Sequence, residues 1–133
     1  MNIKVIICNC NGIKFMPEGL DMNLLPFELE NDNDISYAVV HPQLCGRGGV
    51  NMLQDLLTAA QQNDYFVVAG CGPENQPHFL GHVVDGMRFP DERFVGVNIR
   101  GLDNAQARTA ILEAVGELMV RKNDSPVVDA FGG

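Results

Sequence analysis

Four cysteines are the residues of this sequence whose type and spacing most favour chemistry. Cys8 and Cys10 are one residue apart in the stretch VIICNCNG, Cys45 follows 34 residues later, and Cys71 follows after another 25. Four thiolates suit either an iron–sulfur cluster or a zinc ion. The spacing matches neither a ferredoxin run nor a C-x₂-C zinc ribbon, so the pattern alone does not identify the metal.

Three interpretations of these cysteines stay open on the residue pattern. They could hold one shared metal or cluster. They could instead carry thiol–disulfide redox chemistry, with Cys8 and Cys10, or Cys45 and Cys71, as the exchanging pairs. The third is that they are small apolar side chains buried at strand ends, since cysteine is among the most buried residue types.

Glycines and histidines accompany the cysteines. Gly46, Gly48 and Gly49 follow Cys45 and open an expected helix, and Gly72 follows Cys71. Glycine allows close backbone approach, and free N–H groups at a helix start favour negative charge such as that of a thiolate-bound cluster. His41 and His78 flank the expected site as substitute ligands or proton donors, although a loop histidine is more often merely solvated.

The elements that must position these residues follow from hydrophobic patterning. Four apolar, β-branched runs predict strands buried on both faces, at residues 3–8, 35–40, 65–70 and 93–99. Helical spacing predicts helices at 49–62, 77–86 and 103–121, and one or two helical turns within 17–30.

Apolar stripes mark the two longer helices. The stripe of 103–121 consists of Ala107, Ile111, Ala114, Val115 and Leu118, and the stripe of 49–62 consists of Val50, Leu53, Leu56, Leu57 and Ala60. Asp103, with Gln106 three residues later, resembles a capping box and predicts where the last helix begins.

Alternating strands and helices predict an α/β fold with three layers. We expect about four parallel strands in the order 2-1-3-4, with helices on both faces, in a single domain over 1–121 followed by a tail or linker over 122–133. All parallel strands end at one edge of the sheet, where sites are commonly built. The four sulfurs are therefore expected within a region of roughly 10 Å at that edge.

Composition excludes some classes of partner. Of all residues, 46% are hydrophobic and 20% are charged, as in an ordinary globular domain. The net charge of −8, with scattered arginines, argues against nucleic-acid binding. The sequence shows no signal peptide and no apolar stretch near the roughly 20 residues that cross a bilayer, so we expect no membrane association and a cytoplasmic location.

Four stretches of the chain resemble one family. They are IICNCNG, VVHPQLCGRGGVNMLQDLL, FVVAGCGPENQPHF with its Cys-x-Pro motif, and GVNIRG. Over roughly residues 3 to 121 the chain is similar to the N-terminal domain of the flavin-containing iron–sulfur component of heterodisulfide reductase, which represents a family of iron–sulfur flavoproteins.

The resemblance implies one 4Fe-4S cluster on Cys8, Cys10, Cys45 and Cys71. It implies an electron-transfer component of an oxidoreductase, with no catalytic residue of its own and no flavin bound by this chain alone. Partners would be flavin and iron–sulfur subunits or domains, because the family's flavin and ferredoxin modules are missing here. A homodimer also stays open.

The chain departs from the family at one motif. Many members carry a further cysteine after Asn-Ile-Arg, where this chain has Gly101, Leu102 and Asp103. Four cysteines still suffice for one cluster. A docking or assembly domain without a cluster remains an alternative, beside the thiol–disulfide protein.

Overall fold

The fold is described here from a computed structural model. It describes residues 2–8, 21, 23–32, 34–41, 47–70, 86–99 and 101–123. Along the chain these form β1 (Asn2–Cys8), α1 (Leu25–Glu30), β2 (Ile35–His41), α2 (Arg47–Thr58), β3 (Asp64–Gly70), a 3₁₀ turn η2 (Asp91–Arg93), β4 (Phe94–Asn98) and α4 (Asn104–Asn123).

The four strands form one parallel sheet in the order β2-β1-β3-β4. This confirms both the α/β fold and the strand order predicted from the sequence. Each strand begins within a residue of its predicted start, because runs of β-branched residues fit a pleated sheet better than a helix.

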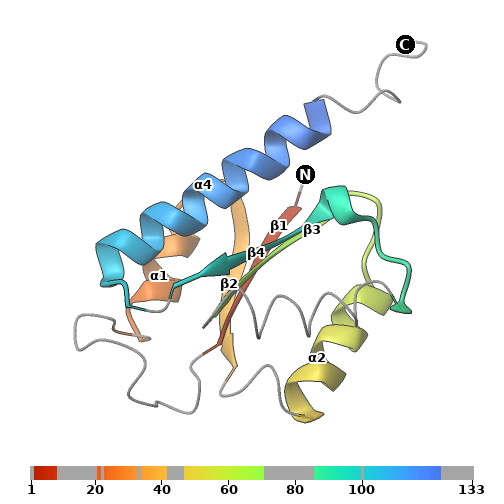
Figure 1. The fold of residues 1–133 in the computed structure, drawn as a ribbon, viewed down its shortest axis with the longest axis horizontal. Coiled ribbons are helices and arrows are strands. Elements are labelled where there is room, and N and C mark those ends of the chain that lie inside the picture. The colour runs from red at the N-terminus through yellow and green to blue at the C-terminus, as the bar shows by residue number, and fades with distance from the viewer. Residues whose placement is uncertain are drawn as a thin grey trace.

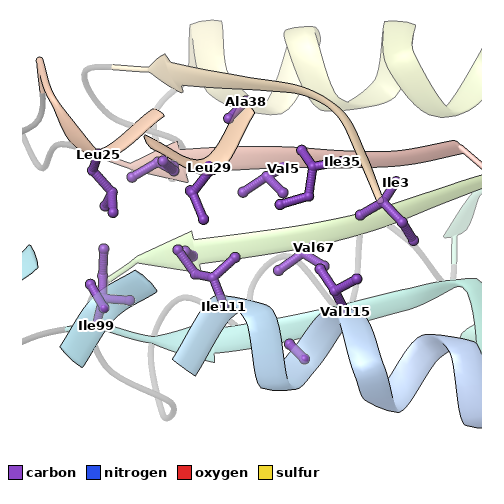
Figure 2. Packing of buried hydrophobic residues seen from close by; sticks show 14 of the residues in the cluster. Ile3, Val5, Leu25, Leu29, Ile35, Ala38, Val67, Ile99, Ile111 and Val115 are labelled. Carbon is purple, nitrogen blue, oxygen red and sulfur yellow. The ribbon is translucent and has the colours of Figure 1, made fainter. Parts of the chain in front are cut away.

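The larger part of the core lies on the face of the sheet covered by α1 and α4 (Figure 1). Leu25 and Leu29 of α1 and Ile111 and Val115 of α4 point toward the strand side chains, among them Val67 (Figure 2). The predicted stripe of the last helix is confirmed, because all five of its residues are buried in this cluster.

The opposite face is covered by α2 (Figure 1). Leu53 and Leu57 of α2 pack with Ile6, Phe66 and Phe89. The Phe66 and Phe89 rings meet edge to face, with centroids 5.5 Å apart. The sheet therefore has helices on both faces, as expected.

The prediction that every strand is buried on both faces is wrong for the two outer strands. All seven residues of β3 are buried, whereas β2 and β4 alternate with exposed or half-buried positions. Val39 of β2 is 37% exposed. The cause is position in the sheet: α2 lies over the inner strands, so that face of β2 and β4 is only partly covered.

The helix limits differ from the predictions by a few residues. Helix α2 runs from Arg47 to Thr58 instead of 49–62, because the chain turns after Leu57, whose carbonyl accepts the Ala60 N–H at 3.2 Å. The expected turns within 17–30 correspond to α1, which has Pro26 in its first turn. The predicted helix 77–86 lies outside the described residues except for Gly86.

The predicted capping box of α4 is confirmed. The Gln106 N–H donates to Asp103 Oδ1 at 2.8 Å, and the Asp103 N–H donates to Gln106 Oε1 at 3.1 Å. Helix α4 continues to Asn123, and the rest of the predicted tail lies outside the described residues. Among the helices that the structure describes, none is both long and apolar enough to cross a bilayer.

Candidate functional site

The candidate site is the edge of the sheet where all four parallel strands end. The strands β1, β2, β3 and β4 end at Cys8, His41, Gly70 and Asn98. Cys8 is in register with His41, and Gly70 with Asn98. Because Ile7 pairs with Ala69, Gly70 lies beside Cys8. We call these four residues the terminal row; across the sheet they run His41, Cys8, Gly70, Asn98.

The terminal row belongs to the face covered by α2. Cys8 packs with Ile6 and Leu53 in the cluster on that face and is only 1% exposed. On β4, Val97 packs on the opposite face against the α4 side, so strand alternation directs its neighbour Asn98 to the α2 face. The thiol and the amide are thus on the same side of the sheet.

His41 reaches the beginning of α2. Its Nε2 would lie 3.9 Å from a Cβ placed on Gly48, in the first turn of that helix. The sequence interpretation treated His41 as a loop histidine beyond the strand, and this is wrong: it is the last residue of β2 and pairs with Cys8. Its imidazole is therefore positioned by sheet register.

The outer half of the row is more open. Gly70 is buried and has no side chain, and Asn98 is exposed. In the row, only the backbone of β3 lies between the side chains of Cys8 and Asn98. This leaves room above β3 next to the thiol.

Three of the predicted site residues are described. Cys8 is in the terminal row, Gly48 is exposed in the first turn of α2, and Gly49 is buried beside it. No acidic residue occupies that first turn. The other predicted site residues lie outside the described residues: Cys10, Cys45, Gly46, Cys71 and Gly72. His78 also lies outside them.

The described residues next to these cysteines in the sequence nevertheless converge. Cys71 directly follows Gly70, and Cys10 comes two residues after Cys8. Cys45 lies between His41, where β2 ends, and Arg47, where α2 begins. The chain therefore enters each cysteine-bearing segment from the same edge of the sheet.

A bound cluster is compatible with this donor set. Among the residues that the structure describes, no group of three or more His, Cys, Asp or Glu could hold a metal ion. Three of the four expected ligands fall outside that part of the chain. The fourth, Cys8, lies at the edge with His41 beside it, and thiolates are the ligands that iron–sulfur clusters require.

A second polar cluster lies at the opposite, amino edge of the sheet. Asp64, the first residue of β3, is 4% exposed and accepts hydrogen bonds from Lys4 Nζ (3.1 Å), Asn2 Nδ2 (3.2 Å) and the Gln61 N–H (2.9 Å). Burial tends to raise the pKa of this carboxyl, but the three hydrogen bonds and the Lys4 charge outweigh burial and leave its pKa below the usual value.

Arg93 completes this amino-edge cluster. Its Nε donates to the Asp64 carbonyl at 3.0 Å, and its Nη2 donates to the Gln61 carbonyl. The guanidinium also lies 4.7 Å from the Phe89 ring centroid. These contacts fix the turn that leads from α2 into β3, so we assign this cluster to stability.

Sequence reasoning missed Gly70 and Asn98 as members of the site. The detectable signal was parity: the last residue of each strand shares a face only when strand ends and register are both known. A shift of one residue in either would turn the side chain to the other face.

The fold and the edge together define a small parallel α/β domain with a thiol and an imidazole in its terminal row. No protein-family model matches the chain, and no curated protein matches it. The resemblance to the heterodisulfide reductase flavoprotein therefore stays a prediction.

Proposed function

We propose that this chain is an electron-transfer module that binds one iron–sulfur cluster, of the 4Fe-4S type, through Cys8, Cys10, Cys45 and Cys71. One observation supports the proposal above the others: the described chain leads into all four cysteine positions from the carboxyl edge of one parallel sheet. Segments that follow adjacent strands start about 4.8 Å apart, which suits a shared centre.

The protein's own residues would bind the centre and shield it. Cys8 would supply one thiolate from within the apolar cluster around Ile6 and Leu53, which restricts water on that side. Gly48 and Gly49 would allow the first turn of α2 to come close, with backbone N–H groups toward negative charge.

The chemistry that a bound cluster supplies is one-electron exchange. One electron comes from a reduced flavin or iron–sulfur partner, and one electron goes to an oxidised partner of the same classes, so no net change remains in this chain. The proposed partners are therefore subunits or domains of a flavin-containing oxidoreductase. We place this activity in the cytoplasm, where thiols are kept reduced.

Burial of Cys8 favours this function over thiol–disulfide exchange. Exchange requires a thiolate to reach the sulfur directly, and at 1% exposure Cys8 offers little access to an attacking thiol. A metal ligand, in contrast, is commonly enclosed by apolar side chains.

The test is anaerobic analysis of iron and acid-labile sulfide, with electron paramagnetic resonance of the dithionite-reduced chain. We expect about four irons and four sulfides per chain and a signal that appears on reduction. Substituting Cys8→Ser should abolish the signal and most of the iron. Val68→Ala is the matched control, because Val68 is buried in the same cluster but is expected to leave the ligands intact.

Two results would contradict the proposal. Colourless protein with four titratable thiols that cycle to disulfides would favour the exchange function. Full iron retention after Cys8→Ser would show that Cys8 is not a ligand.

A further inference from the structure

The terminal row flanks Cys8 with two side chains that carry N–H donors. His41 is its register partner on β2, and Asn98 lies two strands away on β4, beyond Gly70. Both are on the α2 face, the face on which Cys8 packs.

The spacing of the row suits a centre larger than one atom. Adjacent strands are about 4.8 Å apart, so the Cα atoms of His41 and Asn98 are roughly 14 Å apart with Cys8 between them. Gly70 leaves the space above β3 without a side chain. Imidazole and amide groups at the two sides could then reach opposite sides of one group held next to Cys8.

The two side chains are chemically matched to such a group. The sulfur atoms of a thiolate-bound cluster carry negative charge and accept N–H hydrogen bonds. Each such bond is stronger when the cluster gains an electron, since the added charge makes its sulfurs better acceptors. Donors around a cluster therefore raise its reduction potential.

We propose that His41 and Asn98 are positioning residues that donate hydrogen bonds to the cluster sulfurs and raise the reduction potential. This inference rests on the proposed function. It concerns residues that the cysteine pattern does not include, and it gives the terminal row a role in setting the electron affinity of the site.

The experiment is a redox titration at one pH, followed by electron paramagnetic resonance, on the full chain and on paired variants. His41→Leu and Asn98→Leu remove the donor, whereas His41→Gln and Asn98→Gln keep an N–H group. Val39→Ala is the control, because Val39 lies two residues before His41 on the same strand and face and has no side-chain donor.

We expect each leucine variant to keep its iron and to contain about tenfold less reduced cluster at a fixed potential. That change corresponds to a downward shift of about 59 mV for one electron, as expected from the loss of one charge-assisted hydrogen bond. The glutamine variants should recover part of the shift, and Val39→Ala should show none.

Distinct failures overturn different statements. Unchanged potentials in iron-loaded leucine variants would overturn this inference alone. Loss of iron from His41→Leu, in protein that remains folded by circular dichroism, would also overturn it, because His41 would then be a ligand. A wild-type chain that binds no iron would overturn the proposed function and this inference together.

Discussion

Asp64 shows how a single buried charge is stabilised at the amino edge of the sheet. Its carboxylate combines one ion pair with two further hydrogen-bond donors, so nearly every contact favours the ionised form. Lys4, its partner, also lies 5.7 Å from the ring centroids of Tyr37 and Phe66. Removing one member of such a group leaves the others buried without a matching charge.

We predict that Asp64→Asn lowers the free energy of unfolding at pH 7 by about 1–3 kcal/mol, because donors in this cluster lose their charged acceptor. The pKa of Asp64 is lower in the folded chain than in the unfolded chain. Its stabilising effect is therefore present above about pH 4, and it is lost as pH falls through the folded-state pKa.

Urea unfolding at about pH 7 and about pH 3 measures both effects. The wild type should lose more stability between these pH values than Asp64→Asn does. Asp55→Asn, at an exposed carboxyl of α2, is the control and should follow the wild type. Equal pH dependence in the wild type and Asp64→Asn would refute the assignment of a stabilising role to the ionised carboxylate.

At the scale of elements, the junction between β4 and α4 depends on backbone conformation. Gly101 has a φ of +83°, and a Cβ there would meet nothing within 4 Å. A side chain at this position is therefore opposed by backbone strain and not by a clash. The capping box of Asp103 and Gln106 then starts α4 directly after this turn.

We predict that Gly101→Ala destabilises the fold by about 1–2 kcal/mol, the usual cost of a left-handed backbone for an L-residue. Gly116 is the matched control, because it lies within α4, where an added Cβ also meets nothing within 4 Å. Gly116→Ala should stabilise by about 0.5–1 kcal/mol. Thermal melts should show opposite shifts, and a loss of stability in both variants would contradict this explanation.

At the scale of the whole molecule, the proposed cluster would join segments that are distant in sequence. Its ligands follow β1, β2 and β3, so binding would link the starts of three separate connections. A ligand that binds the folded chain and not the unfolded chain adds to stability by mass action.

We therefore predict that anaerobically loaded protein melts roughly 5 °C or more above protein stripped by a chelator and an oxidant. Differential scanning calorimetry under reductant measures the difference. Cys45→Ala provides the comparison, since it should melt at the stripped temperature whether or not iron and sulfide are supplied. The same melting temperature for loaded and stripped wild type would count against a centre bridging these segments.

Much of the fold could be predicted from the sequence because its signals are local. Runs such as YFVVAG favour buried strands, the spacing of Ala107, Ile111 and Leu118 favours one helix face, and Asp103 marks a helix start. Their alternation then restricts the sheet to parallel crossovers, and the order β2-β1-β3-β4 is confirmed.

The remainder depends on relations that no local pattern contains. The partial exposure of β2 and β4 follows from their outer places in the sheet, although their sequences are as apolar as those of inner strands. The pairing of His41 with Cys8 depends on where two strands end and on their register. The predicted roles of Cys10, Cys45 and Cys71 remain predictions, since these residues lie outside the described part of the chain.

The two polar ends of the sheet are separated by the length of a strand. Strand β3 has seven residues from Asp64 to Gly70 and spans about 20 Å, which exceeds the screening length of about 8 Å in physiological salt. Charge changes near Lys4 should scarcely be felt at the far rim. An engineer could thus make the protein more resistant to heat and acid at one end while adjusting how readily it takes up electrons at the other.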